Sequence, residues 1–381
     1  MKHSDGSPFP AYRQELLLKA ALLGGEEMQI AFEEWKKSVV FEKDIEYASF
    51  RMLPLLYQNL KKNRIDDTLM PRLKGIYRKS WSENHLLFYR AGNILDRLHH
   101  EGIKTLVLKG IPLTILYYKN FGVRPMSDMD ILIPSSDVRR TIELLQQWGW
   151  RLYNPQYLEF NLKYGRSATF ADHEKNELDL HWYPVFEVHN RITEEDFWKN
   201  AVPLEVGGIR TLSFSATDIF FHTIVHGLRY NPEPPFRWVA DAVYILNSAG
   251  SSMDWERLLH HTKKFRVTLY MKDAVHYLTE TFHVRFPEPF LKTLKNIPVT
   301  SIDRLVFRHA QKYGDKEPET LYQKVYSLYA AYMRQTSKTG FMERQIDFIK
   351  FLRYRTKGKP YLKILLYYTK LMFQSGSSGK K

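Results

Sequence analysis

Hydrophobic positions follow a helical period in two long parts of the chain and a different pattern between them. From about residue 10 to residue 100, apolar residues recur every three to four positions, which is typical of amphipathic helices. This period ends at Gly102 and returns after Ser215. We therefore expect an N-terminal helical region over residues 1–101 and a C-terminal helical region over residues 215–373.

The segment between them, residues 102–214, predicts an α/β core with a small mixed sheet. Lys104–Lys109 and Asp128–Ile133 are short strand-like runs separated by a break and a short helix. Ser167–Ala171 and Glu177–Trp182 alternate between polar and apolar residues and are joined by five polar residues, which predicts a hairpin. The expected fold class is α+β, with a nucleus of mixed β-sheet flanked by extensive helical regions at both ends.

Four acidic residues stand on the predicted strands of this core, namely Asp128, Asp130, Glu177 and Asp179. Asp128 and Asp130 are one residue apart, so on a strand both side chains point to the same face. Two carboxylates held that close repel each other unless a cation lies between them. Mg²⁺ is commonly bound by such pairs together with substrate phosphates. Asp179 and His181 share one face of the hairpin's second arm. A strand end with two solvated aspartates is the plainer interpretation, because short motifs often match by chance.

The composition is that of an ordinary globular protein and limits the function only broadly. The 381 residues are 44% hydrophobic and 26% charged. The absence of cysteine excludes disulfides and cysteine-ligated zinc. No apolar run is long enough for a transmembrane helix, and the first residues do not resemble a signal peptide. A cytoplasmic location is therefore the default expectation.

The net charge of +14 suggests an anionic partner, such as a nucleotide, a nucleic acid or acidic lipid. Basic residues accumulate at the C-terminal end, where no acidic residue follows Asp347. A solvated helix face followed by a disordered tail over residues 374–381 accounts for this distribution better than a specific nucleic-acid site.

The order of these elements resembles the polymerase-β-like nucleotidyltransferase superfamily. The matching motifs are Leu106–Gly110, Asp128–Ile131 and Leu178–Leu180. More narrowly, the chain is similar to a bacterial group of uncharacterised nucleotidyltransferase family proteins over about residues 10–300. The motifs that carry this narrower resemblance are Leu108–Gly110, Gly122–Asp130, Leu178–Trp182, His226 and Arg237–Asp241.

Two features depart from the superfamily pattern. The turn reads Lys109-Gly110-Ile111, where the superfamily usually has Gly-Gly or Gly-Ser, and the gap from Gly110 to Asp128 is longer than usual. Both departures concern the segment that would hold the phosphates of a nucleotide.

The resemblance implies an Mg²⁺-dependent enzyme, with Mn²⁺ as a substitute, that moves a nucleoside monophosphate from ATP or another NTP to a hydroxyl acceptor. The acceptor could be a small molecule, a peptide or protein, or RNA. Asp128, Asp130 and Asp179 would be the catalytic and metal-holding residues. The residues implied for binding the nucleotide are Lys109, Gly110, Arg124, Ser127 and His181.

The sequence is also compatible with two different functions. The chain could be a catalytically weak nucleotide- or partner-binding protein of the same fold, or an RNA-binding or tRNA-modifying factor. Single residues likewise allow simpler roles. Gly110 could provide a positive φ in a turn. Arg124 could pair with Asp128 instead of phosphate, and Arg237 could form an ordinary i, i+4 ion pair with Asp241.

Overall fold

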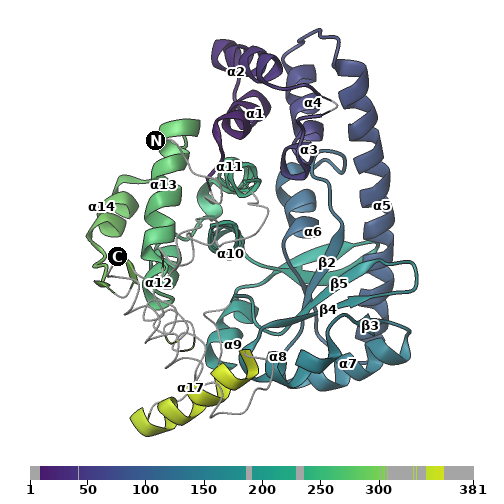
Figure 1. Cartoon of the computed structure of the whole chain (residues 1–381), viewed down its shortest axis with the longest axis vertical. Coiled ribbons are helices and arrows are strands. Elements are labelled where there is room, and N and C mark those ends of the chain that lie inside the picture. Colours follow the sequence, from purple (N-terminus) through teal and green to yellow (C-terminus); the bar gives the residue numbers. More distant parts are fainter. Residues whose placement is uncertain are drawn as a thin grey trace, which may run out of the picture.

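The computed structural model describes residues 9–41, 43–185, 191–228, 236–301 and 340–355, and the single positions 303, 304, 307, 329 and 332. Within these residues the chain is an α+β protein with a mixed sheet, as the sequence predicts, and the sheet has seven strands (Figure 1). The tail predicted over residues 374–381 lies outside the described residues, as does much of the later part of the helical region predicted over residues 215–373.

The N-terminal region is helical, in agreement with the period of its apolar residues. Its helices are α1 Tyr12–Leu22, α2 Gly25–Ser38, α3 Tyr47–Phe50, α4 Leu53–Lys62 and α5 Met70–His100. Helices α4 and α5 each carry a proline in the first turn, where the missing N–H has no intrahelical partner to lose. Helix α5 is 31 residues long and runs along the sheet, burying Phe88 and Leu95 against the strands (Figure 1).

The sheet is mixed, with strands in the order β3-β4-β5-β2-β1-β7-β6. The strands are β1 Leu106–Val107, β2 Asp128–Leu132, β3 Arg151–Leu152, β4 Ser167–Ala171, β5 Glu177–His181, β6 Val202–Val206 and β7 Ile209–Ser213. The predicted hairpin is confirmed as the antiparallel pair β4–β5. Strand β2 pairs with β5 in parallel and with β1 in antiparallel orientation.

Short helices connect these strands. They are α6 Gly110–Pro112, the π-helix Leu113–Tyr118, the 3₁₀ turns Ser135–Asp137 and Pro155–Tyr157, α7 Val138–Gln147, α8 Leu158–Tyr164 and α9 Arg191–Lys199.

The structure contains a second hairpin, β6–β7, that the sequence analysis did not predict. Gly207 and Gly208 form its turn with φ of 57° and 84°. A Gly-Gly pair between two alternating runs is the usual signal for such a hairpin, because both turn residues need positive φ. The two added strands extend the sheet beyond β1.

The two faces of the sheet carry different side chains. Met129, Ile131 and Leu178 point to the face packed by α5 and α7. The opposite face carries Asp130 at the acidic end of β2, while Leu132 further along the strand packs into the core shared with the C-terminal helices. The acidic residues thus lie on the face directed toward the C-terminal helical region.

The C-terminal region is helical in its described parts. Its helices are α10 Ala216–Gly227, α11 Trp238–Ala249, the 3₁₀ turn Gly250–Ser252, α12 Trp255–Lys264, α13 Thr268–Phe282, α14 Glu288–Asn296 and α17 Phe341–Arg355. Helix α17 packs on α8, where Phe351 contacts the rings of Phe160 and Tyr164. No helix in the described ranges combines the length and apolar character needed to cross a bilayer.

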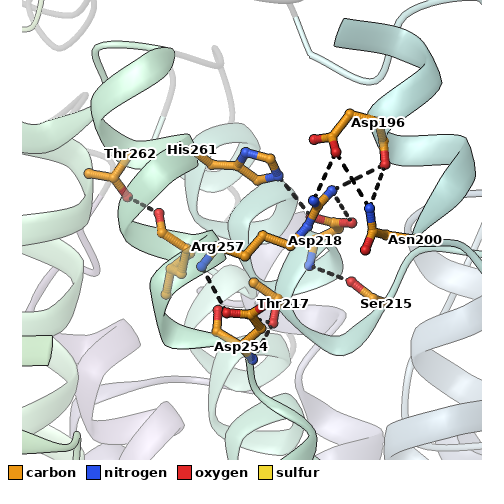
Figure 2. A network of polar contacts seen from close by, with 10 residues as sticks. Asp196, Asn200, Ser215, Thr217, Asp218, Asp254, Arg257, His261 and Thr262 are labelled. Atoms are coloured by element: carbon orange, nitrogen blue, oxygen red, sulfur yellow. Dashed lines mark hydrogen bonds and ion pairs between the residues drawn. The ribbon is translucent and has the colours of Figure 1, made fainter.

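A buried polar network ties α9, α10 and α12 together (Figure 2). Asp218, fully buried in the first turn of α10, accepts hydrogen bonds from Arg257 Nε at 2.8 Å and Nη2 at 3.0 Å. His261 Nε2 lies 3.0 Å from the same carboxylate, and Arg257 Nη1 also donates to Asp196 at 3.2 Å. Ser215 caps α10 by accepting a bond from the Asp218 amide, so the predicted start of this helix is confirmed.

Candidate metal and nucleotide site

The pairing of β2 with β5 brings Asp130, Asp179 and His181 together. Asp130 stands directly beside Asp179 in the parallel register, and His181 follows two positions later on the same face. Each of the three offers a ligand atom, and these atoms lie within 4.8 Å of one another. Residues 51 positions apart in the sequence therefore form one compact cluster, which is called the acidic cluster below.

Lys109 places a positive charge at the acidic cluster. Its Nζ contacts Asp130 Oδ1 and lies 3.9 Å from Asp179 Oδ2. The residue has φ of 52° and ψ of −116°, a backbone conformation that is unfavourable for a side chain with a Cβ. The surrounding structure therefore holds Lys109 in a strained turn that directs its ammonium group at the two carboxylates.

Gly110 is required by packing and not by its φ, which corrects the expectation of a positive φ at this position. The positive φ belongs to Lys109 instead. A Cβ on Gly110 would lie 2.5 Å from Met126 Sδ and 2.7 Å from Arg124 Nη1. Glycine thus lets the loop before β2 close against the start of α6.

His181 is buried and bonded to Asp130, with Nε2 at 2.9 Å from Oδ1. Burial, followed by the charges of Lys109 and Arg166, holds the pKa of His181 well below its usual value. The ring is therefore neutral, and its Nε2 must carry the proton that it donates to the carboxylate. Among the described residues, Nδ1 has no hydrogen-bond partner.

Thr169 on β4 orients the second carboxylate. Its Oγ1 donates a hydrogen bond of 2.6 Å to Asp179 Oδ1. Thr169 stands opposite Asp179 in the antiparallel register, so the hairpin itself fixes this contact. Sequence reasoning missed Thr169, although its alternation along β4 places it on the face of Asp179.

Asp128 and Ser127 lie at the beginning of β2, outside the compact group. Asp128 is half-buried and pairs in register with Glu177, on the same face as Asp130. Ser127 is exposed. The structure thus brings Asp130, Asp179, His181 and Lys109 into contact, with Asp128 two residues from Asp130.

Arg124 is held in a buried ion pair with a residue outside the acidic cluster. Its Nε and Nη2 donate to the two oxygens of Asp241 on α11 at 2.8 and 2.9 Å, and Tyr118 donates to the same carboxylate at 2.9 Å. Burial opposes both charges, yet the charge and hydrogen bonds of the partner raise the pKa of Arg124 and lower that of Asp241.

The i, i+4 pair expected between Arg237 and Asp241 is replaced by this contact. Arg237 Nη1 donates instead to the carbonyl of Pro125 at 2.7 Å. Both arginines therefore act on the segment Arg124–Ser127 that leads into β2. They join that segment to the C-terminal helical region.

The donor set of the acidic cluster suits a hard divalent cation. Carboxylate oxygens are the protein ligands that Mg²⁺ and Mn²⁺ favour, and Asp130 and Asp179 offer theirs within 4.8 Å of each other. The ammonium group of Lys109 contacts the carboxylates in the position of a counter-ion, which shows that this space favours positive charge. The residues present therefore fit a metal ion.

Comparison with known proteins assigns the chain to a protein family. The model of a family described as "Uncharacterised nucleotidyltransferase" matches residues 48–283, more than half of the chain. Among solved structures, the crystal structure of an antigenic nucleotidyltransferase-like protein from Paracoccidioides brasiliensis is similar, with 13% identity and a TM-score of 0.32. That match covers 58% of this chain and 94% of the other. No curated protein matches the sequence.

Proposed function

We propose metal-dependent nucleotidyl transfer as the function of this chain, which belongs to the uncharacterised nucleotidyltransferase family. The enzyme would transfer a nucleoside monophosphate from ATP or another NTP to a hydroxyl group of an acceptor. The observation that carries the proposal is the acidic cluster, where two strand carboxylates and a neutral histidine surround one positive charge. Nothing in the folding of a sheet requires these groups on one face.

The reaction is a displacement at the α-phosphorus. A bond forms between the acceptor oxygen and the α-phosphorus, the bond to the β-phosphate oxygen breaks, and pyrophosphate leaves. The proton of the acceptor hydroxyl would pass to Asp179, which Thr169 orients, and then to solvent. Such a reaction depends mainly on positioning and on neutralising charge.

Asp130 and Asp179, with the nearby Asp128, would hold the metal ion. The ion would supply positive charge to the entering and leaving oxygens. His181 already donates to Asp130, so it fixes the orientation of that carboxylate.

Lys109 would bind the phosphates. Its ammonium group lies at the carboxylates that would hold the metal ion, and there it would pair with a phosphate oxygen of the nucleotide. Gly110 and Arg124 would support this contact indirectly, because Arg124 packs where a Cβ of residue 110 would stand. Ser127 is exposed at the start of β2 and could donate a hydrogen bond to the same ligand.

Label transfer tests the proposal. Purified protein is incubated with each α-³²P-labelled NTP, Mg²⁺ or Mn²⁺, and fractions of small molecules, peptides and RNA. We expect label on one class of acceptor with the wild type, none with Asp130→Asn or Asp179→Asn, and normal transfer with Glu205→Gln. Glu205 is the matched control, since it is an exposed acid on β6 of the same sheet. Transfer by folded Asp130→Asn at the wild-type rate would refute the assignment, as would no transfer by the wild type from any NTP.

A further inference from the structure

A pocket of about 340 Å³ lies at the edge of the sheet where β2 begins, with Met129 of the face covered by α5 among its lining residues. Helices α3 and α5 form its walls, and the segment 125–127 and residues Asn176 and Glu177 of the β4–β5 turn complete it. Ser127 directly precedes Asp128, and Glu177 pairs with Asp128 in register. The pocket therefore adjoins Asp128, the outermost carboxylate of the proposed site.

Arg51 differs from the other positively charged residues that line this pocket because it forms no ion pair among the described residues. The other two cations that line it are paired, Lys79 with Glu83 at 3.7 Å and Arg90 with Glu174 at 2.6 Å. Arg51 is half-buried, and within the described ranges no carboxylate lies at ion-pair distance from its guanidinium. A cation that is partly withdrawn from water without a counter-ion gains from binding an anion.

Large apolar side chains gather around the same pocket. Tyr47, Phe50 and Leu86 line it with exposed fractions of 54%, 37% and 48%. The guanidinium of Arg51 lies 5.4 Å from the centre of the Tyr47 ring. Single exposed apolar residues are ordinary, but several around one pocket next to a charged group are typical of a ligand site.

We propose that this pocket, called the Arg51 pocket below, binds the acceptor as a small molecule with one anionic group attached to an aromatic or aliphatic body. Arg51 binds the anionic group, and Tyr47, Phe50 and Leu86 cover the body. The acceptor hydroxyl then reaches Asp128 past Ser127, around the start of β2. This inference rests on the proposed nucleotidyl transfer and names the class of its acceptor.

The charge and size of the pocket favour the acceptor over the other ligands of the reaction. A triphosphate carries several charges and needs several cations, whereas Arg51 is the one unpaired cation among the described residues that line the pocket. A volume of about 340 Å³ accommodates a small molecule and not a nucleic-acid helix.

Calorimetric titration with phenyl phosphate tests the proposal, with phenol as the probe that lacks the anion. We expect saturable binding of phenyl phosphate to the wild type and none of phenol. Arg51→Gln should weaken phenyl phosphate binding about tenfold or more, the loss expected for one charge-assisted hydrogen bond. Tyr47→Ala should weaken it less. Arg97→Gln is the matched control, because Arg97 also stacks on a ring, that of Trp148 at 4.0 Å, outside the pocket.

A competition experiment distinguishes failure of the acceptor assignment from failure of the proposed nucleotidyl transfer. The non-reactive analogue α,β-methylene-ATP with Mn²⁺ should bind the wild type and Arg51→Gln equally and should not displace phenyl phosphate. Displacement would identify the Arg51 pocket as the triphosphate site and overturn the acceptor assignment. Unchanged phenyl phosphate binding by Arg51→Gln, or none by the wild type, would also overturn it. Failure of the wild type to bind the ATP analogue would contradict nucleotidyl transfer itself, in a separate titration.

Discussion

Removing one partner of the buried Arg124–Asp241 pair should destabilise the protein strongly. Both side chains are about 5% exposed, and the pair is joined by two charge-assisted hydrogen bonds at 2.8 and 2.9 Å. In the variant Arg124→Met, the carboxylate of Asp241 stays buried and keeps the hydrogen bond from the Tyr118 hydroxyl but loses both bonds from the guanidinium. Losing one member of a buried pair costs about 3–5 kcal/mol in free energy of unfolding, mostly because the other charge remains unpaired.

The double variant Arg124→Met with Asp241→Leu should recover most of that loss. It removes both charges and replaces them with apolar groups, so no uncompensated charge stays in the core. The coupling energy of the cycle should therefore be large, on the order of 2–3 kcal/mol.

Urea unfolding, followed by tryptophan fluorescence, measures these free energies. The matched control is Arg139→Met, which breaks the exposed two-bond pair of Arg139 with Glu159 and should leave the unfolding midpoint nearly unchanged. A loss below about 1 kcal/mol for Arg124→Met, or a double variant no more stable than the single one, would refute this account of the pair.

Further predictions concern the turn, the helical network, acid stability and the metal. Gly110→Ala should lower the unfolding free energy by about 1–3 kcal/mol through its clash with Met126, whereas Gly75→Ala, with nothing within 4 Å of the added Cβ, should not destabilise; thermal melting compares them. Asp218→Ala should cost about 3 kcal/mol or more by leaving Arg257 without its buried partner, which urea unfolding measures. The pKa of Asp241 is lowered in the folded state, so its stabilisation is present above pH 3.8 and is lost as the pH falls below that value; acid titration of the double variant should lack this loss. Lys109→Met should bind Mn²⁺ more tightly without nucleotide, because it removes the competing ammonium group, yet should transfer label poorly.

Local pattern was enough to predict the elements that carry the site. Alternation along a strand is a property of neighbouring residues, so the sequence placed Asp128 and Asp130 on one face and Asp179 on the face of His181. Joining the two strands needed more, since β2 and β5 pair residues that are 49 positions apart, such as Asp130 and Asp179. The resemblance to a nucleotidyltransferase family supplied that link.

Contacts between residues far apart in the chain could not be predicted from the local sequence pattern. Arg124 and Asp241 are 117 positions apart, and no local period connects them. The i, i+4 rule suggested Arg237 as the partner of Asp241, but α11 begins only at Trp238, and Arg237 is directed to the carbonyl of Pro125. The sequence suggested a positive φ at Gly110, because glycine is the residue that usually adopts it. In the structure the positive φ belongs to the preceding residue, Lys109.

The central claim is that the acidic cluster binds a divalent metal ion used in nucleotidyl transfer. Titration with Mn²⁺, followed by electron paramagnetic resonance of the free ion, tests it most directly. The account predicts a saturable Mn²⁺ site in the wild type and in Glu205→Gln that is lost in Asp130→Asn, with all three proteins showing the same circular dichroism. Equal Mn²⁺ binding by folded Asp130→Asn and the wild type would contradict it.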